Sequence, residues 1–225
     1  MLRHVLVTGL LLLAAISMGC QSGTESEPEL TTLFQKELDA LREEFDFPGA
    51  TAAYALADGT TGIVATGLAD IESETAMRPT SRMLAASIGK TFVSATVLGL
   101  AQDGKLGLDD SASQWLGDEP WFSRLPNHQD MTIRHLLTHR AGLVNHVDTT
   151  EFAAAFASKW SLPGRPFEPD QLVEFILDKP PLFVAGEGWS YTDTGYILLG
   201  MVIEQATGRS YYEEVEERFL MPLDL

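Results

Sequence analysis

The sequence contains one cysteine and few basic residues, and these two shortages exclude several classes of protein. A single thiol, that of Cys20, cannot form a disulfide within the chain. The 15 Lys and Arg residues are outnumbered by 32 Asp and Glu residues, so the formal net charge at pH 7 is -17. Because nucleic-acid binding requires clustered cations against the phosphate backbone, we expect no nucleic-acid partner.

Motifs that bind cofactors are also missing. The chain has no phosphate-binding glycine loop and no dinucleotide fingerprint, so we expect no cofactor. His135 and His139 are four residues apart, but no glutamate stands between them in the H-E-x-x-H manner, so we predict no metal site. What the chain does have is 45% hydrophobic residues, enough to bury a core in one large domain or two small ones.

The N-terminus has the pattern of an export signal. Arg3 supplies a positive charge, and residues 5–16 form an apolar run that is too short to span a bilayer comfortably. Small residues follow this run. We therefore expect residues 1–19 to be a signal peptide and the mature protein to be exported from the cytoplasm.

The position of Cys20 resembles a bacterial lipobox, in which the cysteine thiol is lipidated and becomes the new N-terminus. Ser17 and Gly19 precede it. The resemblance implies a lipoprotein that is anchored to a membrane on its periplasmic or extracellular face. Polar residues 20–29 would then form a flexible tether, and residues 30–225 the folded part. The alternative is an ordinary secreted protein that is cleaved near Gly19.

Hydrophobic periodicity predicts one helix, then antiparallel strands, then a helical region. The strands flank Asp58-Gly59, a hairpin turn signal, and the sheet looks unfinished because two strands alone are marginal. The helix that begins at Ser87 is apolar almost all round, so we expect it to be buried. The predicted helices are 30–45, 87–102, 132–138, 170–178, 194–206 and one opened by a capping box at Ser210, and the strands are 50–56 and 62–68.

The residues that carry chemistry lie in two segments about a hundred residues apart. Ser87 and Lys90 are three residues apart, so a helix presents the hydroxyl and the amine on one face, one turn apart. A serine hydroxyl becomes a good nucleophile when a nearby base takes its proton. Tyr191 and Asp193 form the second segment and add groups suited to proton transfer. The order of the two segments predicts an acyl-transfer serine hydrolase.

Three segments together resemble the serine beta-lactamase and penicillin-binding-protein superfamily, in its class C branch. Residues 84–92 resemble its nucleophile segment, residues 133–143 a loop segment, and residues 186–200 the second catalytic segment. The resemblance implies an α+β, beta-lactamase/transpeptidase-like fold, with an antiparallel sheet flanked by helices and an additional helical region. It also implies a small-molecule or peptide acyl substrate: an ester, a peptide or a beta-lactam.

The same resemblance implies roles for the candidate residues. Ser87 attacks a carbonyl and is acylated, and its backbone N–H forms half of an oxyanion hole. Lys90 and Tyr191 share the proton transfers, with Tyr191 as a phenolate base that Lys90 stabilises. Water then releases the acyl group.

Two departures from the family pattern affect these expectations. The family usually has Asn where Asp193 stands, and an ionised Asp193 beside Lys90 would raise the lysine pKa and oppose a phenolate at Tyr191. Alternatively, Asp193 only caps the helix that begins near Thr194. The third family motif, Lys-or-His-x-Gly on a sheet strand, is absent. The resemblance therefore implies a C-terminally truncated domain that lacks its final sheet strands and is inactive or nearly so.

Two rival functions remain open. An α/β-hydrolase would need an apolar strand just before Ser87 and a histidine late in the chain, but no histidine follows His146. A surface lipoprotein that binds cell-wall peptides without catalysis would fit both Asp193 and the absent third motif.

Overall fold

A computed structural model describes residues 27–160 and 166–225. The chain divides into two compact units, one ending at Leu84 and the other beginning at Ala85, and each is described by itself. The expected signal peptide and the lipidation site at Cys20 lie outside the described residues. Among the helices of the described ranges, none combines the length and the apolar character that crossing a bilayer requires.

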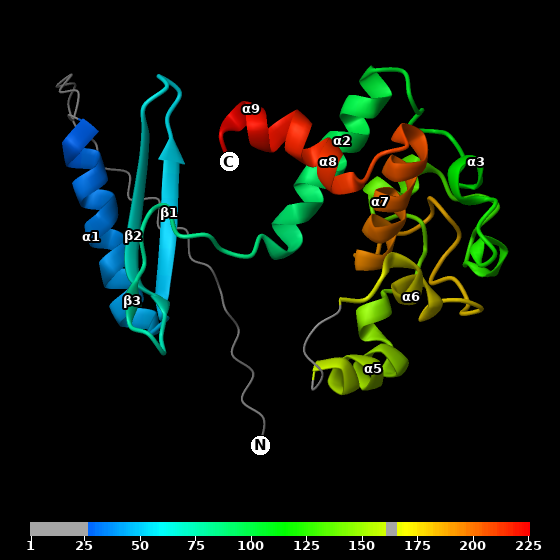
Figure 1. Cartoon of the computed structure of the whole chain (residues 1–225), viewed down its shortest axis with the longest axis horizontal. Coiled ribbons are helices and arrows are strands. Elements are labelled where there is room, and N and C mark those ends of the chain that lie inside the picture. The colour runs from blue at the N-terminus through cyan, green and yellow to red at the C-terminus, as the bar shows by residue number, and fades with distance from the viewer. Residues whose placement is uncertain (1–26, 161–165) are drawn as a thin grey trace. The chain divides into compact units, whose positions relative to one another are not determined.

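The first unit is a three-stranded antiparallel sheet with one helix on its face (Figure 1). Strand β1 (Gly49–Ala55) pairs with β2 (Thr61–Asp70), which pairs with β3 (Thr75–Ala76). The turn between β1 and β2 is closed as expected, because the Asp58 carboxylate accepts the Thr60 N–H at 2.9 Å. Helix α1 (Glu27–Phe45) packs mainly on β2. The predicted helix and hairpin are confirmed, whereas β3 was not predicted.

The second unit is helical and is built around α7 (Asp193–Thr207). Its buried residues recur at intervals of three and four, which gives the helix one continuous apolar face. Gly208 ends it with a left-handed φ of 69°, a conformation that costs glycine little. The core around α7 includes Val97, Leu100, Leu116, Ile133, Leu136, Val173, Ile176, Leu198, Leu199, Val202 and Ile203.

Helix α2 (Gly89–Gln102) differs from the expectation in its start and in its burial. Ser87 belongs to a short 3-10 turn, η1 (Ala86–Ile88), that leads into the helix. Only one face of α2 is buried, through Val93, Thr96, Val97 and Leu100, while Leu98 is 51% exposed. The prediction of a helix buried on all sides was therefore wrong, because the apolar residues outnumber the positions that the core covers.

The other helices of the second unit are short. Helix α4 (Ile133–Leu137) begins at a Thr132 cap, and α8 (Tyr211–Val215) begins at the predicted Ser210 capping box. Helix α6 is shorter than the predicted helix 170–178, since it ends at Glu174. Helices α3 (Ser113–Leu116) and α5 (Thr150–Trp160) were not predicted. The bounds of the remaining elements are α6 Pro169–Glu174, η2 Phe122–Arg124, η3 His146–Asp148, η4 Glu216–Leu220 and α9 Met221–Leu223.

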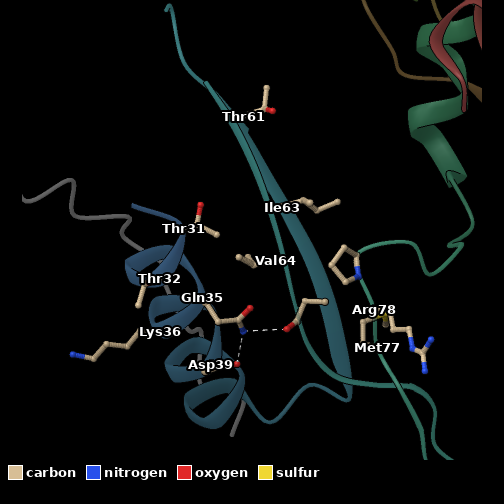
Figure 2. Close-up of a pocket in the computed structure, with 12 residues that line it drawn as sticks. Thr31, Thr32, Gln35, Lys36, Asp39, Thr61, Ile63, Val64, Met77 and Arg78 are labelled. Atoms are coloured by element: carbon tan, nitrogen blue, oxygen red, sulfur yellow. Dashed lines mark hydrogen bonds between the residues drawn. The ribbon is translucent and has the colours of Figure 1, made fainter. Parts of the chain in front are cut away.

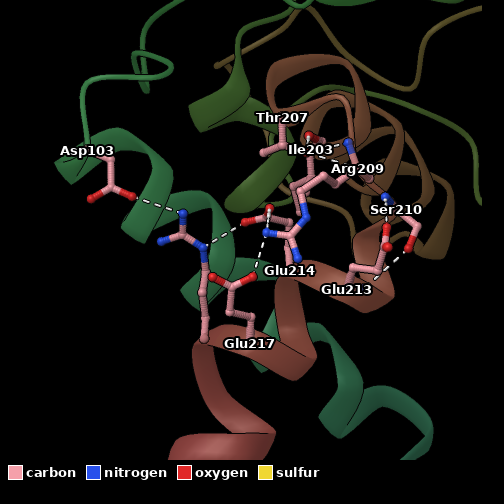
Figure 3. Close-up of polar contacts among 9 residues, drawn as sticks. Asp103, Ile203, Thr207, Arg209, Ser210, Glu213, Glu214 and Glu217 are labelled. Atoms are coloured by element: carbon pink, nitrogen blue, oxygen red, sulfur yellow. Dashed lines mark hydrogen bonds and ion pairs between the residues drawn. The ribbon is translucent and has the colours of Figure 1, made fainter.

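A buried carboxylate joins α8 to the end of α2. The Glu214 side chain is only 4% exposed, and Arg218 donates to it through Nε at 2.9 Å. Arg218 also reaches Asp103, at the C-terminal end of α2, at 2.9 Å. Arg209 lies 3.3 Å from Glu214 and 2.6 Å from Glu217 (Figure 3). A carboxylate removed from water needs such partners, because an unpaired buried charge is costly.

Candidate active site

The candidate nucleophile lies on an unusual stretch of backbone. Ser87 is in η1, and the residue before it, Ala86, has a φ of 45°. Left-handed backbone is uncommon for a residue with a Cβ, and such strain often accompanies functional sites. The 3-10 turn runs directly into α2, so the Ser87 hydroxyl and the Lys90 amine lie one turn apart. Lys90 Nζ is 3.4 Å from Ser87 Oγ.

Tyr191 completes the contact from the other predicted segment. Its hydroxyl donates to Ser87 Oγ at 2.9 Å, although the two residues are 104 positions apart in the sequence. Lys90 Nζ lies 4.8 Å from the centre of the Tyr191 ring, a cation–π arrangement. The structure therefore brings the serine, the lysine and the tyrosine together, within range of direct proton exchange.

Asp193 is part of the same cluster. Its carboxylate forms an ion pair with Lys90, whose side chain is 16% exposed. Asp193 is the first residue of α7, and the helix is capped by Thr192, whose hydroxyl accepts the Thr194 N–H at 3.1 Å. The alternative that Asp193 only caps this helix was therefore wrong.

The surroundings of Lys90 favour its charged form. Burial lowers the pKa of the ammonium, but the hydrogen bonds to Asp193 and Tyr191 more than offset this, so the Lys90 pKa is raised above its usual value. The ion pair with Asp193 raises the Lys90 pKa, which is the direction expected when Asp stands in place of Asn at position 193. In this state Lys90 is a cation that can stabilise a neighbouring phenolate, rather than a free base.

A pocket of about 450 Å³ opens beside these groups. One wall runs from Ser87 in η1 along a face of α2, past Ser94 to Leu98, and the other is formed by His139, Tyr191 and Tyr196. The Tyr196 hydroxyl is occupied by the Leu137 carbonyl at 2.9 Å and by Ser94 at 3.0 Å. Tyr191 is therefore the pocket tyrosine whose hydroxyl bonds to the candidate nucleophile.

A larger cavity, of about 910 Å³, lies in the first unit between α1 and β2 (Figure 2). One of its polar side chains links the two elements: the Gln35 amide donates to Asp39 at 2.9 Å and to the Ala65 carbonyl at 3.0 Å. Its lining residues include no serine, cysteine or histidine that could act as a nucleophile or base at neutral pH. The chemistry is therefore assigned to the smaller pocket.

The two histidines four residues apart have separate structural roles. His135 belongs to the first turns of α4, where its Nδ1 accepts the Thr132 N–H at 3.4 Å. His139 lies beyond the end of that helix, has a φ of 57°, and stacks on Tyr191 with ring centres 4.5 Å apart. His139 and Tyr196 were not predicted to be neighbours of the site, because aromatic stacking between distant segments leaves no spacing signal in the sequence.

Two curated proteins are similar to this chain over most of its length. Penicillin-binding protein 4* of Bacillus subtilis (strain 168) is 29% identical over 158 residues, which are 69% of this chain and 32% of that protein. Esterase EstB of Burkholderia gladioli is 32% identical over 167 residues, which are 72% of this chain and 41% of that protein. The chain thus spans less than half the length of these two curated relatives.

Solved structures agree with this grouping. A D-stereospecific amidohydrolase from Streptomyces sp. superposes with a TM-score of 0.72 at 29% identity, over 87% of this chain and 55% of that one. The D-amino acid amidase from Ochrobactrum anthropi SV3 complexed with L-phenylalanine superposes with a TM-score of 0.69 at 26% identity, over 86% and 50%. The α+β, beta-lactamase-like fold class is therefore confirmed. Since the family profile described as Beta-lactamase matches residues 34–225, the chain belongs to the beta-lactamase family.

Proposed function

We propose that the protein is an acyl-transfer serine hydrolase that cleaves an ester, a peptide or a beta-lactam through an acyl-enzyme on Ser87. One observation carries the proposal: the Ser87 hydroxyl lies 2.9 Å from the Tyr191 hydroxyl and 3.4 Å from Lys90 Nζ. A nucleophile needs a proton acceptor within this reach. The names of the relatives, an esterase and an amidohydrolase among them, support transfer from esters and amides.

The reaction follows from the three groups. In the reactive state Tyr191 is a phenolate stabilised by the Lys90 ammonium, and it accepts the Ser87 proton as Oγ bonds to the substrate carbonyl carbon. Collapse of the tetrahedral intermediate breaks the bond to the leaving group, which takes the proton from Tyr191. Water then attacks the acyl carbon, gives its proton to Tyr191 and frees Ser87, which recovers a proton from Tyr191.

The test is covalent labelling of Ser87. The purified chain is treated with a fluorophosphonate, in which attack by serine Oγ expels fluoride, and separately with a fluorescent penicillin. Labelling requires one attack by Ser87 and no turnover, so we expect an adduct on Ser87 even from a chain that turns over little substrate. The adduct is located by mass spectrometry of peptides and should be absent in Ser87→Ala. Ser94→Ala, a variant of a second serine in the same pocket, should label normally. A folded chain that binds cell-wall peptides but takes no label would instead support the binding-module alternative and contradict the proposal.

Asp193 should set the pH at which Ser87 reacts. Its carboxylate stabilises the Lys90 ammonium. Because like charges repel, an ionised Asp193 also opposes negative charge on the neighbouring Tyr191. In Asp193→Asn the Lys90 pKa should fall and the phenolate should form more readily. The rising limb of the fluorophosphonate labelling rate against pH should therefore shift to lower pH.

The matched control for that shift is Asp148→Asn, which removes one negative charge from an exposed position in η3. It should leave the labelling profile where it is, because Asp148 makes no ion pair with Lys90 in the described structure. Identical profiles for wild type and Asp193→Asn would show that the carboxylate does not control the base.

A further inference from the structure

His139 contacts three consecutive residues of the segment that carries Tyr191. Its backbone carbonyl accepts the Ser190 N–H at 3.0 Å. Its imidazole ring lies against the Tyr191 ring, with centres 4.5 Å apart and planes inclined by 36°. Its Nδ1 accepts the Thr192 N–H at 3.2 Å. One residue thus holds the tyrosine from the backbone on both sides and from the face of its ring.

The backbone conformation of His139 makes these contacts possible together. Its φ of 57° is left-handed, a conformation in which histidine and asparagine are found more often than most residues with a Cβ. The turn directs the carbonyl and the side chain toward the same neighbouring segment. Because Nδ1 accepts a hydrogen bond from a backbone N–H, the neutral ring must carry its proton on Nε2.

The surroundings of the ring favour this neutral form. Burial lowers the His139 pKa and the nearby Lys90 ammonium lowers it further, while Asp193 acts in the opposite direction. The rings of Tyr191 and Tyr196 cover the imidazole, and the ring centres of Tyr196 and His139 are 5.1 Å apart. Protonation of Nδ1 would place a donor opposite the Thr192 N–H and break that contact.

We propose that His139, as the Nε2–H tautomer, is a positioning residue that holds the Tyr191 hydroxyl against Ser87. The kinetic part of this inference rests on the proposed function, while the structural part does not. His139 itself does not touch the Ser87 hydroxyl. It acts by restricting the ring and the backbone on which the proton acceptor is carried, and displacement of a reacting group by about 1 Å can cost about a hundredfold in rate.

The experiment compares His139→Gly with His139→Asn. Both residues tolerate a left-handed backbone, but only asparagine offers a side-chain oxygen to the Thr192 N–H in place of Nδ1. We expect His139→Gly to lower the fluorophosphonate labelling rate of Ser87 by about ten- to a hundredfold, and His139→Asn to recover part of that loss. His135→Asn, which alters an imidazole that caps α4, should label at the wild-type rate.

A second measurement does not depend on reactivity. In the wild-type chain, ¹⁵N spectra of the imidazole groups should show His139 Nδ1 without a proton at pH 7, and proton–proton contacts should join its ring to that of Tyr191. Nδ1 bearing a proton, or a folded His139→Gly that labels at the wild-type rate, would overturn the inference. If the wild-type chain takes no label at all, the proposed function fails, and these spectra alone decide whether His139 holds Tyr191.

Discussion

Tyr191→Phe should reduce the rate at which Ser87 is labelled by a fluorophosphonate by about two to four powers of ten. That is the usual contribution of a positioned proton-transfer group. The substitution removes one oxygen atom and leaves the ring, which can still stack on His139 and lie near Lys90. The loss should therefore appear in the labelling rate constant, while circular dichroism and the thermal midpoint remain close to those of the wild type.

Tyr196→Phe is the matched control. Tyr196 lines the same pocket and lies 5.7 Å from Lys90 Nζ, but its hydroxyl bonds to the Leu137 carbonyl and to Ser94 rather than to Ser87. Its removal should change the labelling rate less than about tenfold, below the range expected for a proton-transfer group. Equal losses in the two variants would mean that neither phenol is the specific partner of the nucleophile.

Arg218→Met should destabilise the second unit by about 3 kcal/mol, the lower end of the range for breaking a buried ion pair. The substitution removes the Nε donor at 2.9 Å from Glu214, whose side chain is 4% exposed, and leaves that carboxylate with only Arg209 at 3.3 Å among the ion pairs of the described residues. The free energy of unfolding in urea measures the effect. All four tryptophans lie beyond Leu84, so their fluorescence follows this unit.

Two variants distinguish a buried charge from a general loss of packing. Arg209→Met removes the other cation near Glu214, but Arg209 is 42% exposed and mainly pairs with exposed Glu217, so the loss should be much smaller. The double variant Arg218→Met/Glu214→Leu should be more stable than Arg218→Met alone, because no carboxylate is then buried without its partner. A double variant that is no more stable than Arg218→Met would contradict this account.

Much of the secondary structure could be predicted because it rests on local signals. The turn at Asp58-Gly59, the Ser210 capping box and Gly208 each satisfy backbone groups within a few residues. Strand β3, by contrast, is two residues long, and α5 packs through aromatic rings contributed by other segments. Such elements depend on partners that are distant in the sequence, so their own residues carry a weak pattern.

The residues of the candidate site could be predicted from the sequence, but the neighbouring residues that hold them in place could not. The closeness of Ser87 and Lys90 was predictable from their three-residue spacing, because one helical turn brings such residues onto the same face. The motif that contains Tyr191 identified the other half of the cluster. Nothing in the sequence indicated that Ala86 adopts a left-handed backbone or that His139 stacks on Tyr191. The burial of α2 was overestimated for a related reason: its composition is apolar on several sides, while the neighbouring helices cover only one of them.

The contact between Lys90 and Asp193 fastens α2 to α7 across 103 residues of sequence, and it also holds the amine in its charged state. The ion pair therefore stabilises the packing of the two helices, but the same ion pair makes removal of the Ser87 proton harder. A substitution that removes the Lys90–Asp193 ion pair would ease proton transfer from Ser87 but weaken the packing of α2 on α7. Selection for thermal stability and selection for turnover should therefore favour different side chains at position 193.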